Sequence, residues 1–210
     1  MNILLDAFGG DNAPDEVIKG AIKAINEVES KITLIGNEQV INERVKQLYG
    51  KNNIKEISQK IGIYNSTQVI TNDELPTKAI KSKKDSSMVV GLNLLKQGYG
   101  DVFVSAGSTG ALLTGAILLV GRIKGVDRPA MAPSLPSYKQ SVLLMDAGAN
   151  TNCRVINYIQ FAQMASLYLE HTKGIKNPRI GLLNIGTEEC KGTELVKEVY
   201  LELKKLRWRR

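Results

Sequence analysis

The sequence predicts an α/β fold in three layers, αβα, with a mostly parallel sheet between two layers of helices. Three observations support this fold class. Short apolar runs alternate with longer helical patterns from one end of the chain to the other. The apolar runs are nearly continuous, which is typical of parallel strands that are covered on both faces. Each run leads into a helix, as a connection between parallel strands requires.

Strand and helix patterns alternate regularly over the first half of the chain. Asn2–Asp6 is an apolar run that predicts a strand, and residues 14–28 predict a helix because Val17, Ala21 and Ile25 fall on one face. The further elements expected here are a strand at 32–36, a helix at 38–48, one or two weaker strands within 54–70 and a helix at 88–96.

The second half of the chain repeats this alternation. A strand at 101–106 leads to an apolar helix at 109–123, and a proline-rich loop at 128–137 precedes a buried strand at 141–146. The remaining elements expected are a helix at 155–171, a strand at 179–185 and a helix at 193–206. We expect all of them to form a single α/β domain over residues 1–210.

The composition excludes several classes of protein. The 210 residues are 43% hydrophobic and 23% charged, as in an ordinary folded chain. The net charge is +7, but five of these charges lie in the last seven residues, so no nucleic-acid partner is expected. The longest apolar stretch, 111–120, is far shorter than the ~20 residues of a membrane span. Two cysteines make no disulfide framework, and no signal-peptide pattern precedes Asp6, so we expect a cytoplasmic protein.

Four loops that follow predicted strands are rich in glycine and polar side chains. They span residues 6–14, 105–110, 146–150 and 184–192. Ligands of open α/β sheets bind outside the carboxyl ends of the strands, where these loops are expected to lie. In the second loop, small residues lead straight into a helix, whose N-terminal N–H groups attract an anion. Together the four loops predict an anion-binding site at one edge of the sheet.

Each loop alone is more often only a turn, and the other candidates for chemistry are weaker. No G-x-G-x-x-G or G-x-x-x-x-G-K-[ST] motif is present, so a dinucleotide or ATP cofactor is not supported, and we expect neither cofactor nor metal. His171, the one histidine, is expected to cap a helix end. Cys153 and Cys190 lie on polar turns without an obvious base, so neither is expected to be a nucleophile.

The basic run at 78–87 has two interpretations that the sequence leaves open. It is either a solvated helix face or a phosphate clamp that includes Lys84 and the hydroxyl pair Ser86 and Ser87. On both interpretations the hydroxyl pair is placed to cap the helix that follows.

These segments resemble the phosphate acyltransferase family of bacterial phospholipid synthesis, the acyl-carrier-protein:phosphate acyltransferases (PlsX). The motifs that carry the resemblance follow the family's order over nearly the whole chain. They are D-A-x-G-G-D-x-A-P at 6–14, K-K-D-S-S-M at 83–88, V-S-A-G-x-T-G-A-L at 104–112, R-P-A at 128–130, D-x-G-A-N at 146–150 and G-L-L-N-I-G-T-E-E-x-K-G at 181–192.

The chain departs from the family at four positions and in length. Phe8, Asn12, Ser108 and Thr193 stand where Met, His, Asn and Asn are usual, so acid–base work by a histidine at position 12 is not expected. Family members are longer, and their C-terminal part supplies further strands and dimer-forming helices. The chain thus resembles a C-terminally truncated member, in which exposed sheet surface and a missing wall of the site are expected.

The resemblance implies an acyltransferase of phospholipid biosynthesis with the phosphate acyltransferase / isocitrate dehydrogenase-like fold, incomplete at the C-terminus. Such an enzyme transfers a fatty acyl group from acyl-[acyl carrier protein] to inorganic phosphate, giving acyl phosphate and free carrier protein. For this reaction, loop position and charge predict three catalytic residues: Lys191, which would supply positive charge, and Asn184 and Asp146, which would orient loops or donors. The residues expected to bind substrate or phosphate are Asp6, Gly9, Gly10, Asp11, Lys84, Ser86, Ser87, Ser105, Gly107, Ser108, Thr109, Gly148, Asn150, Gly186 and Glu188.

The resemblance also implies partners. They are acyl carrier protein, inorganic phosphate, a second copy of the full-length family member in a homodimer, and the inner face of the membrane through peripheral association. Two alternatives stay open because a fold alone does not define an activity. One is an inactive truncated fragment, and the other is a phosphate- or nucleotide-binding domain similar to those of dehydrogenases.

Overall fold

The computed structural model describes residues 1–210 except 51–56, 58, 139–140, 189 and 207–210. The chain divides into two compact units, Met1–Gly121 and Arg122–Arg210. The expectation of one domain over residues 1–210 stays a prediction, and each unit is described by itself below.

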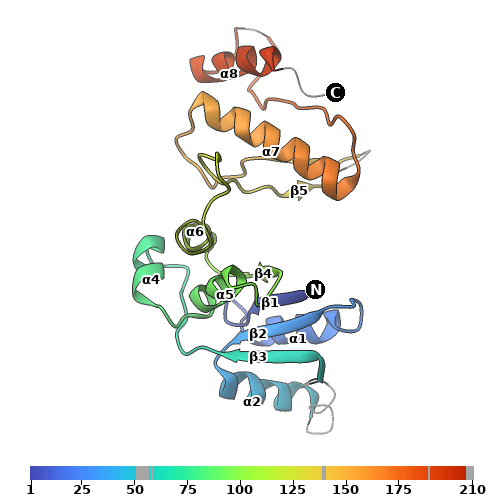
Figure 1. Ribbon diagram of the computed structural model, residues 1–210, viewed down its shortest axis with the longest axis vertical. Coiled ribbons are helices and arrows are strands. Elements are labelled where there is room, and N and C mark those ends of the chain that lie inside the picture. Colours follow the sequence, from blue (N-terminus) through green and yellow to red (C-terminus); the bar gives the residue numbers. More distant parts are fainter. Residues whose placement is uncertain (51–56, 58, 139–140, 189, 207–210) are drawn as a thin grey trace. The chain divides into compact units, whose positions relative to one another are not determined.

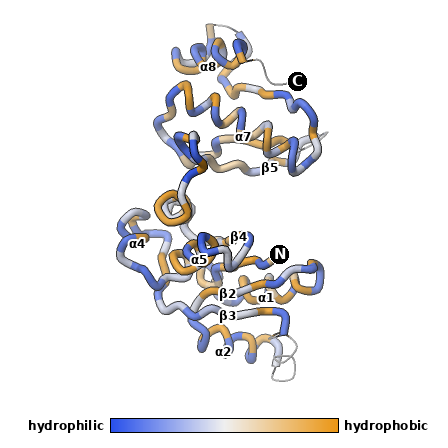
Figure 2. Tube along the Cα trace, in the orientation of Figure 1, coloured by the Kyte–Doolittle hydropathy of each residue, from blue (hydrophilic) through white to orange (hydrophobic). Residues whose placement is uncertain are grey.

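The first unit contains a four-stranded parallel sheet (Figure 1). Its strands are β1 (Asn2–Asp6), β2 (Lys31–Gly36), β3 (Ile61–Asn65) and β4 (Val102–Val104). The spatial order is β3-β2-β1-β4, and Leu4 of β1 lies opposite Thr33 on one side and Phe103 on the other. Apolar residues gather along β2 and α5 (Figure 2). In β2 every residue after Lys31 is buried, and in β1 Leu4 and Asp6 are buried, which fits the burial that continuous apolar runs predict.

Helices cover both faces of this sheet, because successive side chains of a strand point to opposite faces. Leu34 packs with Ile18 of α1 and Ile41 of α2 on one face. On the other face Leu4 packs with Leu94 of α5. The helices described in this unit are α1 (Asp15–Ala24), α2 (Glu38–Tyr49), α4 (Pro76–Ser82), α5 (Ser87–Lys96), α6 (Thr109–Gly115) and the π-helical turn η1 (Ala116–Val120). The predicted αβα class is thus confirmed.

Side-chain caps fix where several helices begin, because the first N–H groups of a helix lack partners within it. Asn37 accepts a hydrogen bond from the Val40 N–H at 3.1 Å at the start of α2. Ser86 accepts one from the Val89 N–H at 3.3 Å at the start of α5. Gly121, with φ of 101°, ends the helix that begins at Thr109, three residues earlier than the sequence predicts.

The described part of the second unit contains two helices and one short pair of strands. Its elements are the antiparallel pair β5 (Ser134–Leu135) and β6 (Val142–Leu143), and the helices α7 (Val155–Lys173) and α8 (Glu194–Lys205). Helices α7 and α8 contact each other. Phe161 of α7 and Val199 of α8 are buried in this unit.

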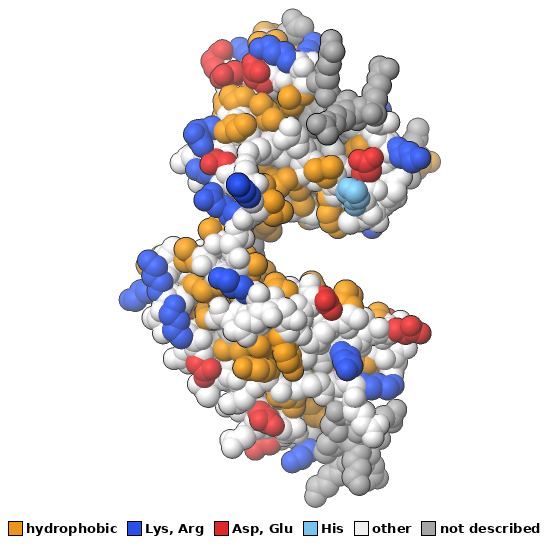
Figure 3. Space-filling model, in the orientation of Figure 1, with side chains coloured by type: hydrophobic (Ala, Val, Ile, Leu, Met, Phe, Trp, Pro, Cys, Tyr) orange, Lys and Arg blue, Asp and Glu red, His pale blue; other side chains and the backbone are white. Residues whose placement is uncertain are grey.

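Two predicted strands of the second unit are wrong in extent or in kind. Of the buried strand expected at 141–146, only Val142–Leu143 is a strand, and it pairs antiparallel with β5. Residues 179–185 form no strand, and Leu183 and Ile185 are 81% and 86% exposed. Apolar side chains reach the surface of this unit (Figure 3). A strand requires hydrogen bonds to a neighbouring strand. An apolar run that has no pairing partner among the described residues therefore forms no strand.

The first unit contains one of the one or two strands expected within 54–70, and a helix at the start of the basic run. Within 54–70 the described residues contain one strand, β3, and residues 51–56 and 58 lie outside the described part. Residues 76–82, which the sequence left as part of a basic run, form α4 with Pro76 in its first turn. Proline fits there because the first N–H of a helix has no intrahelical acceptor.

Candidate functional site

The candidate site lies where the loops after β1 and β4 leave the sheet side by side. From β1 the chain builds outward through β2 to β3, and it then returns to place β4 on the other side of β1. The strand order therefore reverses between β1 and β4. In open α/β sheets, the connections that follow two such strands diverge and leave a crevice at the carboxyl edge. The loops beginning at Asp6 and Ser105 flank this position.

Asp6 and Ser105 join the two loops directly. The Ser105 hydroxyl donates to Asp6 Oδ2 at 2.7 Å, and the Gly107 N–H donates to Ser105 Oγ at 3.0 Å. The other carboxylate oxygen of Asp6 accepts from the Phe8 N–H at 3.2 Å. Asp6 is only 2% exposed. Its charge is therefore used to hold the two loops together and to orient the Ser105 hydroxyl.

Gly9 allows the backbones of the two loops to touch. A Cβ atom at Gly9 would lie 2.6 Å from Asp6 Oδ2, 2.7 Å from Ser105 Oγ and 2.9 Å from the Gly107 nitrogen. Real Cβ atoms do not approach other atoms so closely. Glycine is needed here because any side chain would displace the Asp6–Ser105–Gly107 hydrogen bonds.

Two helices begin beside this contact. Ser108 caps α6 by accepting from the Ala111 N–H at 3.4 Å. The first turn of α5 is close to the same loop, since Met88 Cε lies 3.5 Å from the position of a Cβ at Gly107. The N-terminal ends of helices carry partial positive charge and free N–H groups. The arrangement can hold an anion at the turn formed by residues 107–109.

A third loop, which follows β3, reaches the same edge. The Asn72 side-chain amide donates to Asp11 Oδ1 at 3.2 Å and so connects this loop to the loop after β1. The sequence reasoning treated this stretch as the end of a weak strand and missed the contact. The cluster of turn-forming residues at 71–76 is the signal that could have placed a loop there.

The basic run at 78–87 is only partly solvated, because some of its charged side chains bond to the loop after β3. The Lys83 ammonium donates to Glu74 Oε1 and to the Val69 carbonyl, both at 2.6 Å. Asp85 accepts from the Thr67 N–H at 2.8 Å and from the Thr67 hydroxyl at 2.6 Å. Both residues thus tie down the loop after β3. Phosphate binding by Lys84, which is exposed, and by the buried Ser86 and Ser87 stays a prediction.

In the second unit Asp146 organises its own loop. Its Oδ1 accepts from the Met131 N–H and its Oδ2 from the Asn150 N–H, both at 2.8 Å. The Asn150 amide also donates to the Pro129 carbonyl at 2.9 Å. Burial by itself raises the pKa of Asp146, but the hydrogen bonds from Met131 and Asn150 outweigh it, so the pKa is lowered overall. Gly148, between these residues, has φ of 103°.

This lowered pKa predicts that Asp146 stabilises the second unit least in acid. A carboxylate whose pKa is lower in the folded state contributes stability above its unfolded pKa, and this contribution is lost as pH falls through the folded value. We expect Asp146→Asn to lower the free energy of unfolding by about 1–2 kcal/mol at pH 7. Below about pH 4 this loss should become smaller as the pH falls. Urea unfolding followed by the amide signals of residues 129–150 measures the difference. A cost that is the same at pH 7 and pH 3 contradicts this assignment.

The fourth predicted loop folds back on itself. Asn184 Oδ1 accepts from the Ile185 N–H at 2.9 Å, and its amide donates to the Lys191 carbonyl at 3.2 Å. Gly186 lies against Glu188 and Lys191, since a Cβ there would be 2.6 Å from Glu188 Oε2 and 3.1 Å from Lys191 Cγ. The structure therefore joins Asp6 to Ser105 in the first unit, and in the second unit it shows contacts within the loop at 146–150 and within the loop at 184–192. The meeting of all four loops at one edge stays a prediction.

Four features of the described chain bear on other kinds of site. No group of three or more His, Cys, Asp or Glu side chains among the described residues could hold a metal ion. Burial raises the pKa of the half-buried Cys153 thiol, which disfavours its thiolate form. His171 lies in the last turn of α7. Among the described helices, none combines the length and apolar character that a bilayer crossing requires.

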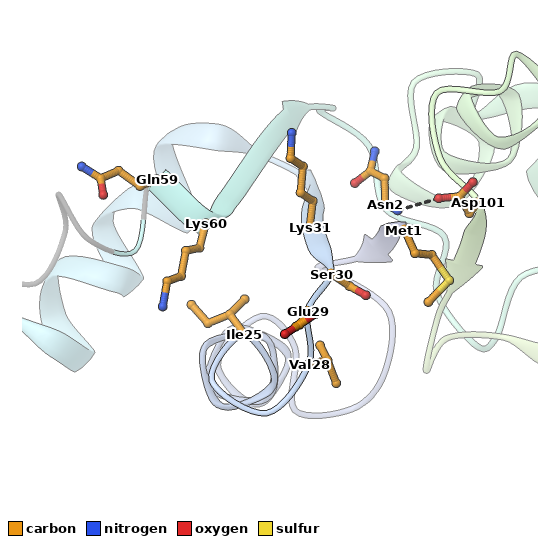
Figure 4. Close-up of a pocket in the computed structure, with 10 residues that line it drawn as sticks. All are labelled: Met1, Asn2, Ile25, Val28, Glu29, Ser30, Lys31, Gln59, Lys60 and Asp101. Atoms are coloured by element: carbon orange, nitrogen blue, oxygen red, sulfur yellow. Dashed lines mark hydrogen bonds between the residues drawn. The ribbon is translucent and has the colours of Figure 1, made fainter.

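An open pocket lies at the opposite end of the first unit's sheet. Asn2, Lys31 and Asp101, at or just before the starts of β1, β2 and β4, line part of it (Figure 4). The Asn2 N–H donates to Asp101 Oδ2 at 2.6 Å there. Ligands of parallel sheets bind at the carboxyl ends of strands, and this pocket surrounds the amino ends. We therefore place the candidate site at the Asp6–Ser105 edge instead.

The fold and this edge define an α/β protein with a candidate site of glycine-rich loops, and comparison with known sequences shows its family. The chain belongs to the family described as "Fatty acid synthesis protein", whose sequence model matches residues 1–208. Several relatives carry the name phosphate acyltransferase. The protein of Thermoanaerobacterium thermosaccharolyticum is 48% identical over 95% of this chain and 57% of its own length. The protein of Acetivibrio thermocellus is 49% identical over 95% of this chain and 58% of its own length. The protein of Clostridioides difficile is 43% identical over 98% of this chain and 59% of its own length. The chain thus spans less than two thirds of the length of these relatives.

Proposed function

We propose that the chain carries the phosphate-binding part of an acyl-carrier-protein:phosphate acyltransferase of phospholipid synthesis. The observation that carries this proposal is the joined pair of glycine-rich loops at Asp6 and Ser105, the second of which leads into the N-terminus of α6. The names of the relatives, which match 95% or more of this chain, support the same reaction. Acyl carrier protein as the acyl donor, dimerisation and peripheral membrane association stay predictions.

The reaction suits a site of hydroxyl and amide groups. A phosphate oxygen attacks the thioester carbonyl carbon, the C–O bond forms, and the C–S bond breaks to release the carrier thiolate, which takes up a proton. Phosphate is itself the nucleophile, so no covalent enzyme intermediate is needed. The protein must bind the anion, hold it about 3 Å from the carbonyl and stabilise the developing oxyanion.

Roles follow from how each group is already bonded. The Ser105 hydroxyl donates a hydrogen bond to Asp6 and accepts one from the Gly107 N–H. It therefore positions the turn instead of binding phosphate with a free hydroxyl. The N–H groups of the helix that begins at Thr109 would then receive the phosphate oxygens. Lys191, whose side chain is exposed in the described structure, would supply positive charge to the oxyanion.

The experiment is thiol release from an acyl-carrier-protein thioester, measured with and without inorganic phosphate. We expect phosphate-dependent release, reduced about tenfold by Ser105→Ala and about 100-fold by Lys191→Ala. Ser82→Ala and Lys176→Ala are the matched controls, because Ser82 bonds only within α4 and Lys176 lies on an exposed loop. Equal rates for test and control variants contradict the assigned roles.

The alternatives give different results in the same preparation. A folded chain that releases no thiol but melts at a higher temperature with phosphate is an inactive fragment that keeps the anion site. A chain that is stabilised by NAD or NADP and not by phosphate is a dehydrogenase-like binding domain, and this outcome would remove the proposal.

A further inference from the structure

The loop after β3 contains a turn that bonds to Lys83 at its base and to the loop after β1 at its tip. We define the Asn72 turn as residues 71–74, in which the Glu74 N–H donates to the Thr71 carbonyl at 3.4 Å. Asn72 at its tip donates to Asp11 in the loop after β1. The turn therefore joins a loop outside the predicted site to a loop inside it.

Glu74 and Lys83 hold the base of this turn. Glu74 Oε1 accepts from the Thr71 N–H at 2.8 Å, from the Thr71 hydroxyl at 3.2 Å and from the Lys83 ammonium at 2.6 Å. The two side chains of the ion pair are about 30% exposed. The hydrogen bond from Lys83 is the main cause that lowers the pKa of Glu74, which favours the carboxylate form of Glu74.

Lys83 also fixes the chain on the other side of the turn. Its ammonium donates to the Val69 carbonyl, so a single cation connects Val69, Glu74 and, through Glu74, Thr71. Lys83 itself is anchored at the end of α4, where its N–H donates to the Ala79 carbonyl at 2.9 Å. The turn is thus attached to a helix that packs in the core through Ala79 and Ile80.

We infer that Lys83 and Glu74 are positioning residues that hold the Asn72 turn against Asp11 and thereby fix the glycine-rich loop at residues 9–11. Gly9 in that loop contacts the Asp6–Ser105–Gly107 network, so a loose loop would loosen the anion site. The inference rests on the proposed function for its effect on phosphate, but the contact itself can be tested without any ligand.

The test compares Lys83→Met, Lys83→Arg and Asn72→Ala with the wild-type chain by amide NMR. In the ligand-free protein, Lys83→Met should move the signals of residues 9–11 in the same direction as Asn72→Ala, and Lys83→Arg should restore them in part. Lys19→Met is the matched control, because the Lys19–Glu16 pair has a similar length of 2.7 Å and lies on α1. Signals of residues 9–11 that do not respond to Lys83→Met overturn the inference.

Titration with inorganic phosphate measures how the loss of these contacts changes phosphate binding. We expect Lys83→Met to weaken phosphate binding about fivefold, and Lys83→Met combined with Asn72→Ala to weaken it no further than either change alone. Effects that multiply in the double variant would show that Lys83 acts only on general stability, and they would overturn the inference. A wild-type chain that does not bind phosphate removes the proposed function, while the ligand-free signals still decide the positioning role.

Discussion

Gly9→Ala is expected to weaken phosphate binding at the proposed site on the Asp6–Ser105 edge by more than about tenfold. The added Cβ would lie within 3 Å of Asp6 Oδ2, Ser105 Oγ and the Gly107 nitrogen. Two of these atoms are joined by the 2.7 Å hydrogen bond between the loops, and the third donates to Ser105. Relief of the overlap must separate them, at a cost of about 1–3 kcal/mol in stability. We expect the phosphate-induced change in amide signals to weaken more than about tenfold, since the anion site loses its geometry.

Gly20→Ala is the control for this prediction. Gly20 lies in the middle of α1, and a Cβ there would meet no atom within 4 Å. Alanine favours a helix over glycine, so this variant should be more stable by about 0.5–1 kcal/mol and should bind phosphate normally. The proposal fails if Gly9→Ala and Gly20→Ala bind phosphate equally well.

Leu4→Ala is expected to be among the most destabilising single truncations in the first unit. Leu4 is fully buried in β1, one of the two central strands of the sheet, and it packs with Ile35 and Leu94. Removal of its side chain leaves a cavity between the sheet and α5. Buried Leu→Ala changes cost about 2–5 kcal/mol, and we expect a value near the middle of this range. Urea unfolding of the first unit, followed by the amide signals of β1 and β2, gives the loss.

Leu75→Ala tests whether this cost comes from burial. Leu75 precedes α4 and is 71% exposed, so its truncation removes little apolar area from the core. Its cost should stay within about 0.5 kcal/mol. A similar loss of stability in Leu4→Ala and Leu75→Ala would show that Leu4 is not a core residue of a packed sheet.

The elements that the sequence placed correctly are those with a strong local pattern. Apolar runs predict β1 and β2 to within one residue, and the periodicity of α2, α5 and α7 places each helix to within two residues of its observed bounds. Caps such as Asn37 and Ser86 use only side chains that are close in the sequence. Such signals depend on a few neighbouring residues, so they can be recognised without the fold.

The candidate site was only partly predictable. The polar residues of the loops after β1 and β4 could be named, because each loop follows a predicted strand and such loops lie at the carboxyl edge of a parallel sheet. The Lys83–Glu74 ion pair and the contact of Asn72 with Asp11 could not be predicted. The first pair is separated along the chain by α4, and the second is separated by α1, β2, α2 and β3. A basic run looks the same in the sequence whether its ammonium groups meet water or a carboxylate.

What the sequence determined by itself is local: which segments are apolar enough to be strands, where helices begin, and which turns are free of bulky side chains. The tertiary structure alone decided the order β3-β2-β1-β4, which brings Asp6 beside Ser105. It also decided that residues 179–185 are unpaired in spite of their strand-like composition. The physical reason is the same in both cases. A strand is stabilised by hydrogen bonds and packing with neighbours that lie far away in the chain, so its own residues do not specify its partner.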